Sequence, residues 1–136
     1  MDVINRVLTF WFNGNFKDRR KAWFIKSADF DDKIKIKFGG DVEKASANAY
    51  NIHTQTSEGV LTLMILLDQF PRNIFRGDPQ AFATDLKALG IAKQAIKNGL
   101  DADLSIVQKL FFICGLNIVK YGRLKQGLRI IHGIRC

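Results

Sequence analysis

The residues best suited to chemistry follow directly after the most apolar stretch of the chain, residues 60–67. Two acids, two arginines and a glutamine come after it at short spacing: Asp68, Gln69, Arg72, Arg76 and Asp85. A charge set against buried apolar surface is costly unless it is paired or binds a ligand. We therefore take these five as candidate ligand-binding residues, with Asp68 as the candidate catalytic acid or base.

Arginine is the side chain that best matches the planar geometry of a carboxylate or phosphate. The Asp78-Pro79 pair is typical of an N-cap followed by the first residue of a helix, which would place backbone N–H groups beside the two arginines. These features predict a site for a small anionic ligand or a peptide. The alternative is structural: Asp68 and Asp85 pair with the arginines and tie the turn to its helices.

The spacing of four between Asp68, Arg72 and Arg76 places all three on one helical face if the helix continues through Pro71. Proline disfavours helical geometry in the residue before it, so a turn here is the alternative. In either case we expect Asp68, Arg72, Arg76 and Asp85 to meet.

The sequence lacks the motifs that hold common cofactors and metals. It has no Gly-rich phosphate loop, HExxH, CxxC pair or G-x-S-x-G, and Cys114 and Cys136 lack the spacing of a zinc site. We expect neither a cofactor nor a metal. His53 has no second ligand or base partner in its vicinity, so we assign it a surface role.

Helical periodicity with clear caps runs along the chain. Asp2 is expected to cap a helix that ends at residues 13–15, and Asp29 one that ends at Gly39-Gly40. Asp41 then caps a short polar helix over residues 42–51. Ser57 caps the central helix, whose apolar residues face all directions and predict burial on most sides.

Two further helices are predicted after the candidate site. Asp85 is expected to cap the first, Gly99 to end it, and Asp101 or Asp103 to start the second. The apolar stripe of the first comprises Leu86, Leu89, Ile91, Ala92, Ala95 and Ile96. Helices of this length with short connections predict an all-α domain of antiparallel helical hairpins.

Composition fits one soluble domain of 136 residues with 47% hydrophobic and 25% charged residues. No apolar run approaches the length of a membrane span, and no targeting segment is visible, so we expect a cytoplasmic protein without membrane contact. The net charge of +8 includes five cations and no acid in residues 114–136. Because the basicity is concentrated there, it does not favour nucleic-acid binding.

Several segments resemble a bacterial family catalogued as domain of unknown function 924. They are residues 7–12 (Val-Leu-Thr-Phe-Trp-Phe), the Trp23-Phe24 pair, residues 66–77 (Leu-Leu-Asp-Gln-Phe-Pro-Arg-Asn-Ile-Phe-Arg-Gly) and residues 81–85 (Ala-Phe-Ala-Thr-Asp). The resemblance covers residues 1 to about 112. It implies an all-α, tetratricopeptide-like cytosolic protein and no established reaction.

The family pattern continues with Phe-Tyr-Met/Leu-Pro-Phe-x-His-Ser-Glu, whereas this chain departs from it after Phe112. One set of codons for residues 111–120, TTT TTT ATA TGC GGT TTA AAC ATA GTG AAA, gives Phe-Tyr-Met-Arg-Phe-Lys-His-Ser-Glu when read two bases later. We therefore predict a partial all-α domain over 1–112, a frameshifted basic tail over 113–136, and a truncated, non-functional product. A divergent C-terminus is the alternative.

Two classes of function follow. In the first, the protein is a helical binding scaffold in which Arg72 and Arg76 contact an anionic ligand. In the second, it is a small-molecule enzyme in which Asp68 acts as acid or base, the arginines clamp the substrate, and the missing His-Ser-Glu motif would complete the site.

Overall fold

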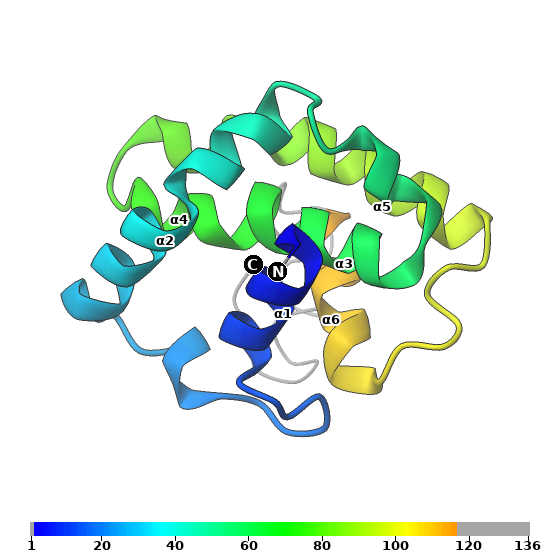
Figure 1. Ribbon diagram of the computed structural model, residues 1–136, viewed down its shortest axis with the longest axis horizontal. Coiled ribbons are helices and arrows are strands. Elements are labelled where there is room, and N and C mark those ends of the chain that lie inside the picture. Colours follow the sequence, from blue (N-terminus) through cyan, green and yellow to red (C-terminus); the bar gives the residue numbers. More distant parts are fainter. Residues whose placement is uncertain (1, 117–136) are drawn as a thin grey trace.

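The structure, a computed structural model, describes residues 2–116, and this part of the chain is all-α without a strand. The elements follow one another as α1 (Val3–Phe12), η1 (Lys21–Trp23), α2 (Ala28–Ser46), η2 (Asn51–Gln55), α3 (Ser57–Met64), η3 (Ile65–Gln69), α4 (Phe70–Ile74), η4 (Pro79–Phe82), α5 (Asp85–Lys97) and α6 (Ile106–Gly115). Helix α3 lies at the centre, and α1, α5 and α6 pack on it, while α2 packs on α4 (Figure 1). The all-α prediction is confirmed.

Helix α1 has the ends that the sequence predicts. The Asp2 carboxylate accepts a hydrogen bond from the backbone N–H of Asn5 at 2.8 Å, as expected for an N-cap. Asn13 ends the helix in the left-handed conformation with φ 52°. The helix buries Trp11 and Phe12 completely, so it contributes an aromatic face to the core.

Helix α2 corrects the prediction of two separate helices. It begins after Ser27 rather than Asp29, and it runs through Gly39-Gly40 to Ser46. Asp41 is therefore an interior residue and not an N-cap. The buried residues Ile34, Phe38, Val42 and Ala45 form one stripe across both glycines, and burial of this stripe outweighs the low helix propensity of glycine.

Asp41 contributes to this continuity because it joins α2 to two other segments. Arg6 of α1 forms a bidentate pair with its carboxylate at 2.8 and 3.0 Å, and the Tyr50 hydroxyl donates to it at 2.6 Å. Burial and the bond to Asp41 raise the pKa of Tyr50 to about 12. This cluster fixes α1 against the C-terminal half of α2.

The predicted burial of the central helix on most sides is confirmed. Residues 60–67 of α3 and η3 have almost no exposed surface. The cap is displaced by one residue from the prediction: Thr56 accepts from the Gly59 N–H, and Ser57 instead donates its hydroxyl hydrogen to the Leu100 carbonyl. Ser57 thus ties the start of α3 to the connection between α5 and α6.

The helix continues past Pro71, but through one wider turn. Residues Ile65–Gln69 form a π-helical turn in which the Phe70 N–H bonds to the Ile65 carbonyl, and α4 follows directly. Pro71 has no N–H with which to bind the carbonyl of Leu67 four residues earlier. The hydroxyl of Thr84 donates to that carbonyl instead, at 2.6 Å.

The last two helices differ from the prediction at their starts and on one face. Thr84, not Asp85, is the N-cap of α5, and Ser105, not Asp101 or Asp103, caps α6 in a capping box with Gln108. Gly99 ends α5 with φ 76°, as predicted.

The buried stripe of α5 is made of small residues, Asp85, Ala88, Ala92 and Ala95. Leu86, predicted to be in the core, is 70% exposed, and Ile96 is exposed as well. Helix α6 runs to Gly115, so the domain boundary predicted after residue 112 falls inside a helix, and most of the predicted tail lies outside the described residues.

Candidate functional site

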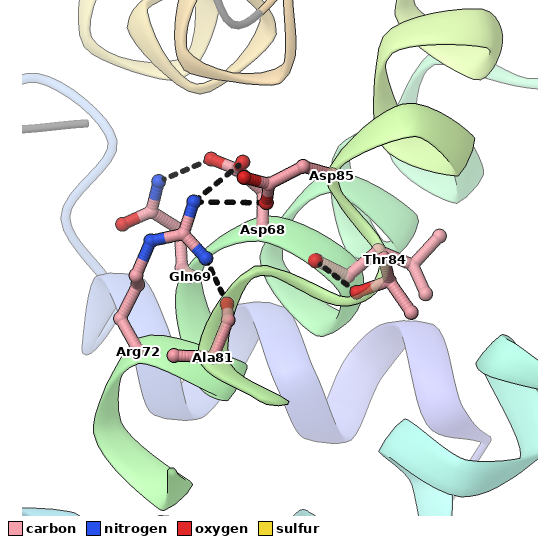
Figure 2. A network of polar contacts seen from close by, with 7 residues as sticks. Asp68, Gln69, Arg72, Ala81, Thr84 and Asp85 are labelled. Atoms are coloured by element: carbon pink, nitrogen blue, oxygen red, sulfur yellow. Dashed lines mark hydrogen bonds and ion pairs between the residues drawn. The ribbon is translucent and has the colours of Figure 1, made fainter. Parts of the chain in front are cut away.

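Arg72 is the centre of the polar network at the end of the central helix (Figure 2). One terminal nitrogen, Nη2, lies 2.9 Å from Asp85 Oδ1 and 3.6 Å from Asp68 Oδ1. The other, Nη1, donates to the carbonyl of Ala81, and the guanidinium carbon lies 4.4 Å from the centre of the Phe82 ring. Arg72 thereby joins α4, η4 and the first residue of α5.

The two carboxylates differ in their surroundings. Asp68 is 1% exposed, and Gln69 donates its amide hydrogen to Asp68 Oδ2 at 2.9 Å. Burial raises the pKa of Asp85, and this effect exceeds the opposing effect of Arg72. Asp68 and Gln69 both belong to the π-helical turn, and Arg72 follows in α4.

Arg76 does not join this cluster, which corrects the expectation that all four charged residues meet. Helix α4 ends at Ile74, and Arg76 turns toward α2, where it forms a bidentate pair with Asp31 at 2.8 and 3.0 Å. The Asn73 amide donates to the same carboxylate at 2.8 Å. Burial raises the pKa of Asp31, but the bonds from Arg76 and Asn73 outweigh it and hold the value below its usual range.

Asp78 and Pro79 begin a helix as predicted, but this helix offers no anion site. It is the short turn η4, and the Asp78 carboxylate already accepts from the Gln80 N–H at 2.8 Å. The charges of both arginines are likewise matched by acids, Arg72 by Asp68 and Asp85 and Arg76 by Asp31. The arginine and carboxylate groups that form these pairs therefore have the structural role of the alternative interpretation: they tie the turn to its helices.

A pocket of about 310 Å³ lies beside Arg72 and Arg76. It is lined by Trp11, Trp23, Phe24, Ile25, Lys26, Gln69, Arg72, Asn73 and Arg76. Three of the five candidate residues, Gln69, Arg72 and Arg76, thus line one concave surface. Asp68 and Asp85 lie behind Arg72 and are not among the lining residues.

Two buried N–H donors belong to residues that line this pocket. Trp11 Nε1 and Arg72 Nε have no hydrogen-bond partner among the described residues. In Figure 2 the Nε of Arg72 lies on the side of the guanidinium that faces away from Asp68 and Asp85. Sequence reasoning missed Trp11 as a site residue, because its helical spacing predicts a core position, and it is indeed only 2% exposed.

The segment before α2 lines the pocket with four consecutive residues, 23–26. Trp23 stacks on Trp11 with ring centres 5.6 Å apart and donates its own N–H to the Trp11 carbonyl at 2.9 Å. These contacts anchor the segment before α2 on α1. The N–H of the Trp23 ring is thus bonded within the protein, whereas the N–H of the Trp11 ring has no partner among the described residues.

Two general properties of the described region bear on the site. Among residues 2–116 no three His, Cys, Asp or Glu side chains are grouped in a way that could hold a metal ion. None of the helices in the same region has the length and apolar character needed to cross a bilayer.

Comparison with known proteins now identifies the family. The model of a family described as "Bacterial protein of unknown function (DUF924)" matches residues 7–119. The chain belongs to this family. The match confirms the resemblance carried by residues 7–12, 66–77 and 81–85, and it extends seven residues beyond the predicted boundary at 112.

A solved structure shows the same fold. It is that of a protein of unknown function from Agrobacterium tumefaciens, 28% identical, with a TM-score of 0.78 over 96% of this chain and 78% of the other. None of the curated proteins matches this chain. Family and fold are thus established, and both the family and the solved structure are described as being of unknown function. The tetratricopeptide-like relationship stays a prediction.

Proposed function

We propose that this protein binds a small carboxylate-bearing ligand in the pocket between Trp11, Trp23 and Arg72. The observation that carries the proposal is a pair of buried donors, Trp11 Nε1 and Arg72 Nε, in two residues that line one pocket. A buried donor without an acceptor costs about 1–3 kcal/mol. A ligand oxygen that accepts from these donors removes that cost and gains charge-assisted bonding from Arg72.

The paired arginines define the recognition chemistry. Their acids neutralise them and hold them in place, so the two arginines contribute oriented N–H groups to recognition rather than an uncompensated charge. Lys26 lines the pocket without an ion pair among the described residues and supplies one positive charge. The volume, at the lower end for ligand sites, favours a small molecule over a peptide.

Substitution of the two stacked tryptophans tests the proposal. Trp11→Phe keeps a ring but removes the unpartnered donor, whereas Trp23→Phe removes a donor that already bonds to the Trp11 carbonyl. Calorimetric titration with a panel of acetate, succinate and benzoate is expected to find binding that Trp11→Phe weakens about tenfold or more, as for loss of one bond to a charged group. Trp23→Phe is expected to lower stability and to retain most of the affinity.

Equal affinity in wild type and Trp11→Phe would contradict the proposal. Arg72→Lys gives a second test, because lysine keeps the charge but lacks Nε and the planar fork. Unchanged binding together with lowered stability in Arg72→Lys, measured in this chain and in a longer homologue, would leave only the structural role of the arginine.

A second candidate is a small-molecule enzyme with Asp68 as acid or base. The observation that favours it is the pair of buried carboxylates that share Arg72, one of them Asp85 with a raised pKa, because such groups are frequent in active sites. Asp68 is not among the residues that line the pocket. Turnover of a metabolite mixture by wild type, lost in Asp68→Asn, is the result that this candidate requires.

The frameshift hypothesis for residues 113–136 and the prediction of a non-functional product remain proposals, as does the cytoplasmic location. The nucleotide sequence around codon 112 tests the first: a shifted frame that does not encode His-Ser-Glu and a further helical pattern refutes it. The binding proposal does not depend on this outcome, since every residue that lines the pocket precedes residue 77.

A further inference from the structure

A second and larger concave surface lies between α1 and α2, and it shares no residue with the carboxylate pocket. Its volume is about 510 Å³. Its lining consists of four cations, three phenylalanines and two neutral polar residues: Arg6, Arg20, Lys33, Lys37, Phe10, Phe30, Phe38, Thr9 and Asn13. We call this surface the α1–α2 groove. No acidic residue lines it.

The cations of the groove differ in how far their charge is compensated. Arg6 is neutralised by its bidentate pair with Asp41. Arg20 instead donates to two backbone carbonyls at the end of α1, those of Phe10 and Trp11, at 2.7 and 2.8 Å. It forms no ion pair within residues 2–116, and its partial burial lowers the pKa of the guanidinium.

The two lysines lie one helical turn apart on the exposed side of α2, so both side chains border the groove. Neither forms an ion pair within the described part of the chain, although the acidic residues Asp29 and Asp32 are on the same helix. Together with Arg20 they give the groove three positive charges that the surrounding described residues do not match.

The floor of the groove is aromatic. Phe10 stacks on Phe30 with ring centres 5.5 Å apart and meets the edge of Phe38 at 5.3 Å. The charged ends of Arg6, Arg20 and Lys37 each lie 5.8–5.9 Å from the centre of one of these rings. Cation–π attraction therefore holds the cations over apolar surface, where a charge has fewer water molecules around it.

We propose that the α1–α2 groove is a binding site for a small aromatic anion, a planar ring that carries a phosphate. The phosphate contacts Arg20, Lys33 and Lys37, and the ring packs against the phenylalanine floor. The volume lies within the range of small-molecule sites, and the two parts of the ligand match the two kinds of surface.

Three matched probes separate these contributions: phenyl phosphate, inorganic phosphate and phenol. In calorimetric titrations at low salt, phenyl phosphate is expected to bind at least about tenfold more tightly than either fragment, because it alone uses both floor and cations. Equal affinity for phenyl phosphate and inorganic phosphate would overturn the proposal, since it would show a diffuse charge effect only.

Charge-matched variants locate the site. Lys33→Gln/Lys37→Gln removes two cations from the groove, and Lys35→Gln/Lys93→Gln removes two exposed lysines that do not line it. All four lysines are exposed, so both variants are expected to unfold at the wild-type temperature. The first should weaken phenyl phosphate binding about tenfold or more, and the second should leave it nearly unchanged.

Two further results would overturn the proposal. One is an equal loss of affinity in both double variants. The other is binding of oligo(dT) that tightens with length and displaces phenyl phosphate, because this would identify the groove as part of a nucleic-acid track. Binding of phenyl phosphate that is unaffected by Trp11→Phe separates this site from the carboxylate pocket.

Discussion

Gly59 occupies a position in the first turn of α3 where the chain has no room for a methyl group. A Cβ there would lie 2.0 Å from the backbone carbonyl oxygen of His53. The backbone of His53 thus lies against the start of the central helix. The requirement for glycine comes from this close approach and not from an unusual φ.

Gly59→Ala is therefore expected to destabilise the protein by about 1–3 kcal/mol or more, since the obstacle is backbone and cannot rotate away. Chemical denaturation followed by circular dichroism measures this free energy of unfolding. Gly40→Ala is the matched control: nothing lies within 4 Å of its Cβ position inside α2, so it is expected to stabilise by about 0.5–1 kcal/mol. Destabilisation of equal size in both variants would refute this interpretation.

At the scale of elements, the π-helical turn connects the buried helix to the polar network. Pro71 leaves the Leu67 carbonyl without its usual helical donor, and Thr84 supplies the bond from the start of α5. The Thr84 hydroxyl makes no capping bond to α5, although Thr84 is the N-cap residue. The bond from Thr84 holds the start of α5 against η3, next to the point where Arg72 of α4 reaches Asp85.

Thr84→Val is expected to lower the free energy of unfolding by about 1–3 kcal/mol, because it leaves the Leu67 carbonyl unpaired with almost no change in shape. In a Pro71→Ala background the N–H of residue 71 can bond to that carbonyl, so the same substitution is expected to cost much less. A double-mutant cycle from urea unfolding measures the difference. Additive effects of the two substitutions would contradict the assignment.

At the scale of the whole molecule, two ion pairs join segments that lie far apart in sequence: Arg6–Asp41 joins α1 to α2, and Arg76–Asp31 joins the end of α4 to α2. For Asp41, burial raises the pKa, but the bonds from Arg6 and Tyr50 outweigh it and hold the value below the usual 3.8. A carboxyl with a depressed folded-state pKa stabilises the fold above its unfolded pKa. That contribution disappears as the pH falls through the depressed value.

Asp41→Asn is accordingly expected to lower the melting temperature at pH 7, with a difference from wild type that shrinks below pH 4. Asp85 contributes a pH dependence of stability with the opposite sign, because its raised pKa means that protonation favours the folded state. Asp85 is present in both proteins compared, so it contributes to both. Asp32→Asn, at an exposed position of α2, is the control and is expected to have little effect at any pH. A pH-independent deficit in Asp41→Asn would contradict the ion-pair explanation.

Much of the fold follows from local spacing that is visible in the sequence. Asp2 and Asp78 are N-caps as predicted, Gly99 ends a helix, and residues 60–67 are buried, because caps and periodicity depend on residues a few positions apart. The family also follows from the sequence, through contiguous segments such as residues 66–77. The continuity of α2 through Gly39-Gly40 did not follow, because contacts of Phe38 and Asp41 with other elements decide it.

The candidate site, too, was predicted from the sequence only in part. From the sequence alone we predicted that Asp68, Arg72, Arg76 and Asp85 meet, and three of them do, since only a turn of helix and one connection separate Asp68, Arg72 and Asp85. Only the tertiary structure decided that Arg76 turns to Asp31 and that Trp11, with a buried and unpartnered N–H, lines the pocket. The reason is physical: which acid an arginine meets, and whether a buried donor finds an acceptor, depends on how helices distant in sequence pack against one another.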